Sequence, residues 1–380
     1  MSSTPLVLLW DNFGPLHNDR IEAVQRFFGE AREVIGVELC GRSDVYGWET
    51  GGTQSFRKET LFEGKSFEDL SKWQIFRALN RLSRRIGKGD YFFCHWENRG
   101  IFLSAIWLRL TGRRVFTMGC SKFDDKPRSV WIESIKSLFF LPYNGALGSG
   151  DRSIGYFRYL GFKTGETAGE YNTVSLDRIR HQAGLGQFSE AEPDEGPAHY
   201  ARGFLCVARL VEKKNHKMLI DAYAEYCTLS PAPRPLELCG NGPLENELKA
   251  QAVRLGVADR ITFSGFTQSD VTSQRMAQAL ALLLPSLEEQ FGNVVPEAQA
   301  LGLPVVISDN AGARDKLVRT AVNGFLIEAD NPKGLAFIMY LLETDETLWQ
   351  RCRAGAFEAA PQGDVAAFAQ GIAALVDRDG

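Results

Sequence analysis

Two glutamates, Glu289 and Glu297, lie on either side of a predicted strand-to-helix junction, with seven residues between them. An apolar strand ends at Leu284 and a helix is expected over 292–301, beginning near Gly292. Ligands of parallel α/β sheets bind at the carboxyl ends of strands, and the first N–H groups of a helix attract an anion. Glycine lets the backbone approach a ligand closely, and carboxylates accept hydrogen bonds from sugar hydroxyls. The stretch predicts a site for a ligand that carries both an anionic group and hydroxyls.

Two basic residues follow the strand expected over 203–208. The guanidinium fork of Arg209 and the ammonium group of Lys214 suit a diphosphate. The alternative is a solvated basic loop, which is the reading we favour for Lys213. A second loop, Gly240-Asn241-Gly242, follows the next strand, but Glu245 stands where a dinucleotide fingerprint needs its third glycine, and this disfavours an oxidoreductase.

The first half of the chain offers a glycine and three polar residues near strand ends. Gly14, His17 and Arg20 follow the strand Pro5–Trp10, where the two side chains suit an anionic group such as a phosphate. The alternative for them is a surface loop that caps a helix. His95 ends the strand expected over 90–95, and its alternative is a packed histidine with satisfied hydrogen bonds.

Short apolar runs alternate with amphipathic stretches along nearly the whole chain, which predicts parallel sheets covered by helices on both faces. The acidic, proline-containing segment 184–203 has no apolar periodicity and is the best candidate for a linker. Two doubly wound α/β domains on either side of it are therefore expected. Strands are expected over 5–10, 34–38, 90–95, 114–118, 145–148, 203–208, 236–239, 261–264, 280–284 and 304–307.

Composition excludes several classes of protein. The 380 residues are 44% hydrophobic and carry a net charge of −4, which permits a large core and argues against coating nucleic acid through bulk positive charge. The seven cysteines never form a C-x-x-C pair and the five histidines never form an H-x-x-x-H pair, so we expect no metal site. No apolar run reaches the length of a membrane span and no signal peptide is visible, which favours the cytoplasm.

The run from Pro285 to Val306 resembles the retaining glycosyltransferases of family four, glycosyl transferases group 1, with Gln290 in place of the usual first glycine. The resemblance implies the GT-B fold, in which two Rossmann-like domains are separated by a cleft. It implies an acceptor domain over 1–190, a donor domain over 200–360 and a C-terminal helix, within 361–380, that crosses back to the first domain. Matches around Arg209, Gly242 and Phe266 extend the resemblance over roughly 203–326.

The same resemblance implies residue roles and a reaction. A hexosyl group would pass from a UDP- or GDP-linked nucleotide sugar to a glycan, a lipid-linked or a small-molecule acceptor, and its anomeric configuration would be retained. The reaction would need no cofactor and no metal. Such reactions occur in polysaccharide biosynthesis. The implied catalytic residues are Arg209, Lys214 and Glu289. The implied donor-binding residues are Gly14, Gly242, Phe266, Phe291, Gly292, Asn293, Val294 and Glu297, and the acceptor candidates are His17, Arg20 and His95.

One departure keeps alternatives open. Many family members carry a histidine after the strand expected over 114–118, where this chain has Gly119 and Cys120. His95, on the same sheet edge, is a candidate substitute. The alternatives to a transferase are a GT-B sugar-nucleotide epimerase and an inactive relative that acts as a binding subunit.

Ten basic residues against two acidic ones lie between Ser71 and Arg114, although the whole chain is acidic. The helix expected over 73–86 places arginines beside an apolar stripe of Ile75, Leu79, Leu82 and Ile86. We expect this stripe to pack on the sheet. The alternative is peripheral contact of the N-terminal domain with the inner face of an anionic membrane. The basic residues are Lys72, Arg77, Arg81, Arg84, Arg85, Lys88, Arg99, Arg109, Arg113 and Arg114.

Overall fold

The computed structural model describes residues 4–41, 55–125, 128–189 and 196–377, which form two compact units. The first unit comprises Met1–Thr173 with Val365–Gly380, and the second comprises Val174–Asp364. The boundary comes earlier than the one expected near residue 190. The reason is helix α6 (Leu176–Gln182), which packs against α9 (Ser269–Gln278) of the second unit. Of the expected linker, 190–195 lie outside the described residues.

The first unit is built on a seven-stranded sheet whose order is β3-β2-β1-β4-β5-β6-β7, with every adjacent pair parallel. The strand order reverses between β1 and β4. Edge strands β3 and β7 lack the apolar pattern that marked the central strands. The strands are β1 (Leu6–Trp10), β2 (Val34–Cys40), β3 (Arg57–Phe62), β4 (Asp90–Phe93), β5 (Arg114–Gly119), β6 (Gly145–Gly148) and β7 (Thr167–Ala168).

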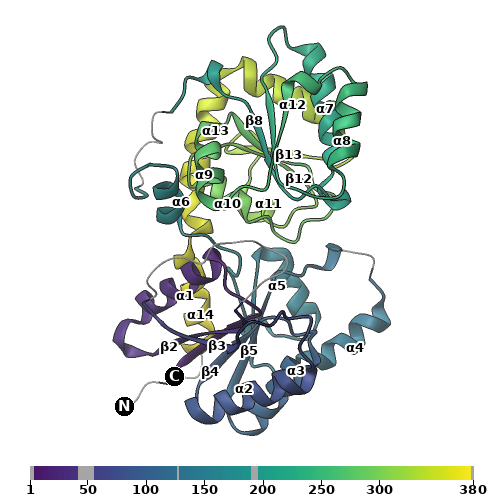
Figure 1. The fold of residues 1–380 in the computed structure, drawn as a ribbon. Coiled ribbons are helices and arrows are strands. Elements are labelled where there is room, and N and C mark those ends of the chain that lie inside the picture. The colour runs from purple at the N-terminus through teal and green to yellow at the C-terminus, as the bar shows by residue number, and fades with distance from the viewer. Residues whose placement is uncertain (1–3, 42–54, 126–127, 190–195, 378–380) are drawn as a thin grey trace. The chain divides into compact units, whose positions relative to one another are not determined.

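Helices cover both faces of this sheet (Figure 1). Helices α1 (Pro15–Phe28) and α14 (Val365–Val376) pack together and bury apolar residues of β1 and β4 on one face. On the other face, α2 (Lys72–Ile86), α3 (Arg99–Leu110) and α5 (Gly150–Tyr159) join the core, while α4 (Val130–Phe140) contributes Phe140. Ile75, Leu79 and Leu82 of α2 are buried there, so the apolar stripe of this helix packs on the sheet as expected.

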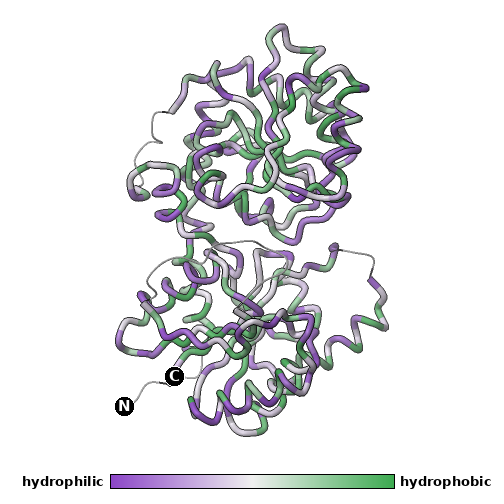
Figure 2. The backbone as a smooth tube through the Cα atoms, in the orientation of Figure 1, coloured by the Kyte–Doolittle hydropathy of each residue, from purple (hydrophilic) through white to green (hydrophobic). Residues whose placement is uncertain are grey.

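The second unit has a six-stranded parallel sheet in the order β10-β9-β8-β11-β12-β13, which reverses between β8 and β11. Apolar strands lie in the centre of each unit in Figure 2. This arrangement confirms the predicted fold class of two doubly wound α/β domains. The strands are β8 (Phe204–Val207), β9 (Leu236–Cys239), β10 (Ile261–Gly265), β11 (Ala281–Leu284), β12 (Val305–Ser308) and β13 (Gly324–Ile327).

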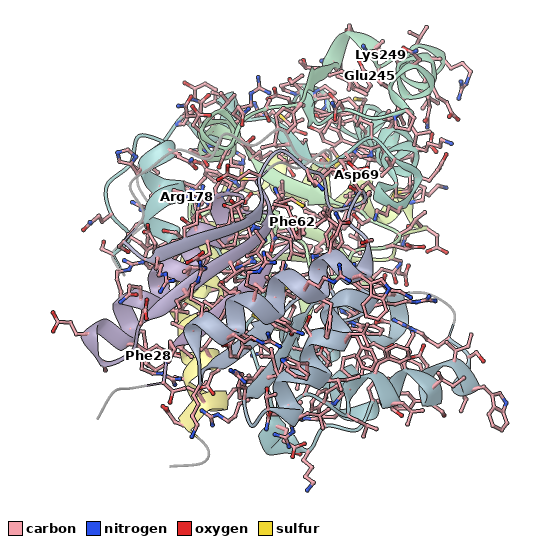
Figure 3. All side chains as sticks on the ribbon, turned by 60° about the horizontal axis from the view of Figure 1, so that its bottom comes forward. Phe28, Phe62, Asp69, Arg178, Glu245 and Lys249 are labelled. Carbon is pink, nitrogen blue, oxygen red and sulfur yellow. The ribbon has the colours of Figure 1, made fainter. Side chains whose placement is uncertain are left out.

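In the second unit, α7, α8, α12 and α13 share a core with the sheet, and α10 contacts both α9 and α13. Helix α8 carries an exposed pair, Glu245 and Lys249, one helical turn apart and 2.6 Å between charged atoms (Figure 3). Helix α10 begins two residues later than expected and ends at Gln299. The helices are α7 (His216–Leu229), α8 (Glu245–Arg254), α10 (Val294–Gln299), α11 (Arg314–Leu317), α12 (Pro332–Thr344) and α13 (Glu346–Ala359).

Candidate functional site

The loops that follow β8 and β11 meet at the reversal point of the second sheet, where ligands of doubly wound folds bind. The backbone N–H groups of Leu287 and Glu288 donate to the carbonyl of Lys213, at 2.9 and 3.2 Å. These bonds join the loop after β11 to the 3₁₀ turn Glu212–Lys214. The two most specific stretches of the sequence therefore form one structural site.

Lys214 and Glu289 form an ion pair across these two loops, with Nζ donating to Oε2. Their side chains are only 15% and 16% exposed, so solvent screens the pair less than it would a surface pair. The sequence assigned the two residues to separate motifs. The structure brings them into direct contact.

Arg209 is exposed, and among the described residues nothing hydrogen-bonds or ion-pairs with its guanidinium. Its loop is held by the loop after β9, because Leu210 donates its N–H to the carbonyl of Asn241 at 2.8 Å. A Cβ at Gly242 would lie 2.3 Å from the carbonyl oxygen of Leu210. Gly242 thus permits the loop after β9 to approach the backbone of Leu210 closely, and this contact positions Arg209. The guanidinium of Arg209 is then available for an anionic ligand.

The resemblance to family four implies a glycine at position 215, where this chain has Asn215, which adopts the left-handed conformation with φ of 61°. Asparagine tolerates this conformation better than most residues. Its Nδ2 donates to the carbonyls of Pro285 and Ala329, at 3.1 and 2.7 Å. The substitution therefore keeps the backbone geometry and ties the Lys214 turn to the loop after β11.

The remaining donor candidates surround the start of α10. Gly292 has φ of 103°, a conformation that favours glycine, and Phe291 is buried. The carbonyl groups of Glu289 and Phe291 accept from Gly312 and Ala313, at 3.2 and 2.9 Å. Asn293, Val294 and Glu297 are partly exposed, and Phe266, after β10, is 43% exposed. The loop that carries Glu289 is thus fixed on both sides, by the Lys214 turn and by the loop after β12.

The reversal point of the first sheet carries a second ion-pair cluster. Nε2 of His95 lies 3.3 Å from Oδ1 of Asp11, and Nδ1 lies 3.4 Å from Oε1 of Glu97. Burial opposes protonation of His95, but the hydrogen bonds to the two carboxylates outweigh it and raise the pKa of His95 to about 9. His95 is thus a cation at neutral pH, on a backbone with φ of 57°.

His17 and Arg20 are held inside the first unit by hydrogen bonds. Gly14 is the N-cap residue of α1, and its N–H donates to Nδ1 of His17 at 3.0 Å. Burial and the charge of Arg20 lower the pKa of His17 to about 3, so His17 is neutral. Arg20 is 2% exposed, donates twice to the carbonyl of Thr173 and lies over the ring of Tyr171.

The sequence missed two residues of the His95 cluster. Asp11 directly follows the first strand and Glu97 lies two residues after His95, so strand-end position was the signal that could have found both. Within 4–41, 55–125, 128–189 and 196–377, no group of three or more His, Cys, Asp or Glu side chains lies close enough to hold a metal ion.

Comparison with known proteins agrees with this architecture. Residues 187–359 match the family model of glycosyl transferases group 1. An uncharacterized glycosyltransferase of Methanocaldococcus jannaschii is 32% identical over 133 residues, which are 35% of this chain and 33% of the relative. A D-inositol 3-phosphate glycosyltransferase of Streptomyces bingchenggensis is 36% identical over 118 residues, 31% of this chain and 26% of the relative. The chain therefore aligns with about a third or less of the length of these relatives.

A similar solved structure covers nearly the whole chain. Anabaena Alr3699/HepE in complex with UDP and glucose superposes with a TM-score of 0.69 at 19% identity, over 98% of this chain and 99% of that one. The fold is therefore GT-B, as predicted. The match to glycosyl transferases group 1 lies within the second unit.

Proposed function

We propose that the chain is a retaining glycosyltransferase that moves a hexosyl group from a nucleotide sugar to a glycan, lipid-linked or small-molecule acceptor. The observation that supports this most is the arrangement of Arg209, Lys214 and Glu289 at the reversal point of the second sheet. It combines Arg209, which pairs with no described residue, with the ion pair of Lys214 and Glu289 and with loops that are joined by backbone hydrogen bonds. The complex of HepE with UDP and glucose supports a UDP-linked donor.

The leaving group of such a reaction is a nucleoside diphosphate, whose negative charge grows as the bond to the sugar breaks. Arg209 and Lys214 would bind this charge, and fixed cations that meet developing charge are often the largest source of rate enhancement. Diphosphate would compete with Glu289 for Lys214. The freed carboxylate of Glu289 would then accept hydrogen bonds from hydroxyls of the donor sugar, and Glu297 from those of the ribose.

Calorimetric titration with UDP, GDP and their glucose and mannose conjugates tests donor binding. We expect either UDP or GDP to bind, and we expect Arg209→Ala to weaken this binding. Lys333→Ala, a change at a lysine of α12 that we assign no role, is the control. Equal binding by wild type and Arg209→Ala would overturn the site assignment.

Product analysis then separates the alternatives. A retaining transferase joins the sugar to the acceptor with the anomeric configuration that it had in the donor. An epimerase instead inverts a stereocentre of the donor's own sugar. The glycine and cysteine at 119 and 120, in place of the family histidine, motivate a hydrolysis assay. Donor binding without hydrolysis or transfer to any acceptor would favour the inactive binding subunit.

A further inference from the structure

Most of the apolar residues of helix α4, in the first unit, face solvent, whereas its one acidic residue is buried. Trp131 is 83% exposed, Ile135 59% and Leu138 58%, at the spacing of one helical face. Val130, Ile132 and Leu141 extend this face and are also exposed. We call these six residues the α4 apolar face.

The inner side of α4 contacts the first unit through a small number of side chains. Phe139 packs on Phe102 of α3, with ring centroids 4.7 Å apart, and Phe140 is buried. Glu133 is buried and accepts from the hydroxyl of Tyr156 at 2.5 Å and from Lys136 at 2.7 Å. The only acidic residue of α4 therefore points inward and is neutralised.

The exposed sides of α3, which contacts α4, and of α2, which packs on α3, are basic. Helices α2 and α3 contain no aspartate or glutamate at all, and Figure 3 brings α2 to the front of the first unit. Arg77, Arg81, Arg99 and Arg109 are exposed, and no described residue forms an ion pair with them. Arg99 lies one turn before Phe102, the residue on which α4 packs.

We propose that the α4 apolar face, with the arginines of α2 and α3, docks the chain on an anionic lipid bilayer. Tryptophan and aliphatic side chains enter the interface between headgroups and acyl chains, and exposed arginines attract anionic headgroups. A second copy of the chain is a poorer occupant, because a symmetric contact would bring two basic surfaces together. Within the described ranges no helix could cross a membrane, so contact through these helices would be peripheral.

The apolar surface proposed here to face the lipid differs from the one considered from the sequence. There the lipid-facing candidate was the apolar stripe of α2, which the structure places in the core. In the structure, α2 supplies only charge and α4 supplies the apolar surface. The proposal does not depend on the proposed catalytic activity.

The test is co-sedimentation of the full chain with vesicles of phosphatidylcholine, with and without about 30% phosphatidylglycerol. We expect binding to the anionic vesicles that falls when salt is raised from about 50 mM to about 500 mM. Trp131→Ser/Ile135→Ser/Leu138→Ser should reduce the partition coefficient about tenfold or more. The matched control is Val253→Ser/Phe337→Ser, two exposed apolar residues of the second unit, which should bind as wild type.

Charge and depth are tested separately. Arg99→Gln/Arg109→Gln should weaken binding to anionic vesicles, whereas Arg254→Gln/Arg351→Gln, two exposed arginines elsewhere, should not. Brominated lipids should quench the fluorescence of Trp131, and Trp131→Phe should bind but lose that quenching.

Three outcomes would overturn the proposal. The first is no binding of the wild type to anionic vesicles, and the second is equal binding by wild type and the triple variant. The third is a wild-type chain that binds no vesicles but forms a dimer in ultracentrifugation, with the dimer lost in the triple variant. UDP titration of the triple variant keeps the two proposals apart, since α4 lies in the first unit and the Arg209 site lies in the second. An unchanged thermal midpoint confirms that the variant is folded.

Discussion

The ammonium group of Lys214 donates to the carboxylate of Glu289, across the two loops that meet where the order of strands in the second sheet reverses. Each group neutralises the other in the ligand-free chain. An anionic ligand that takes Lys214 must therefore separate a pair that is largely shielded from water. Under the proposed function, this competition would weaken the binding of a nucleotide more than that of its sugar conjugate, whose hydroxyls would donate to the freed carboxylate.

Glu289→Gln should bind UDP about threefold to tenfold more tightly, because Lys214 is then free for the diphosphate. The same variant should transfer sugar more slowly, since the carboxylate that would hold the donor sugar is gone. Titration calorimetry gives the first effect and turnover the second. Weaker UDP binding in Glu289→Gln would show that Glu289 holds Lys214 in place for the diphosphate rather than competing with the diphosphate for Lys214.

Arg209→Ala should lower kcat/KM by an amount that corresponds to about 2–4 kcal/mol of transition-state stabilisation. The thermal midpoint should hardly change, because the side chain is exposed and unpaired among the described residues. Arg209→Lys should recover part of the rate through its charge. Wild-type turnover in Arg209→Ala would remove Arg209 from the catalytic site.

Glu297→Ala should raise KM for the donor more than it lowers kcat, if Glu297 holds the ribose in both the ground state and the transition state. Steady-state kinetics at varied donor concentration separates the two constants. Glu358→Ala, at an exposed glutamate of α13, is the control. A fall in kcat alone would move Glu297 from donor binding to the reacting centre.

Transfer should continue in excess EDTA. The proposed cations Arg209 and Lys214 take the part that a divalent metal plays in other transferases. Complete loss of activity with EDTA, and its return with Mg²⁺ or Mn²⁺, would contradict this assignment.

The first unit should lose stability as pH rises toward 9. The pKa of His95 is raised from 6.5 to about 9, so its stabilisation is fully present below pH 6.5 and disappears as pH rises through 9. Solvent reaches the cluster, so we expect only about 1 kcal/mol of difference between wild type and His95→Asn over this interval. Asparagine is chosen because it tolerates the positive φ. Calorimetric midpoints that fall in parallel in both proteins would count against the His95 cluster.

The sequence located the strands that carry the candidate residues, but it did not show how the segments after those strands pack together. The strands expected over 203–208 and 280–284 followed from apolar runs, and Arg209, Lys214 and Glu289 lie in the loops after these two strands. The contact between Lys214 and Glu289 is a relation between distant segments, and it became visible only when β8 and β11 were placed side by side. The left-handed conformation of Asn215 likewise became visible only in the structure.

Edge strands and exposed helices were harder to predict, for a physical reason. Strand β3 is half-exposed and charged, so it has no apolar alternation, and it forms because β2 offers a parallel partner. The sequence of α4 is apolar and amphipathic like that of a core helix. Periodicity identifies which residues share a face, but it does not say whether that face meets protein or solvent.

Helix α14 has a consequence for how the chain is made. It supplies Phe368 and Ile372 to the core around Trp10. Gly371 allows it to pack against the carbonyl of Gly169, because a Cβ at position 371 would lie 1.9 Å from that oxygen. All strands of the first sheet have been synthesised by Ala168, yet part of the cover for one face leaves the ribosome only after the entire second unit. The first unit is therefore completed last although it begins first. A fragment cut at Thr173 would leave the apolar surface around Trp10 open to aggregation.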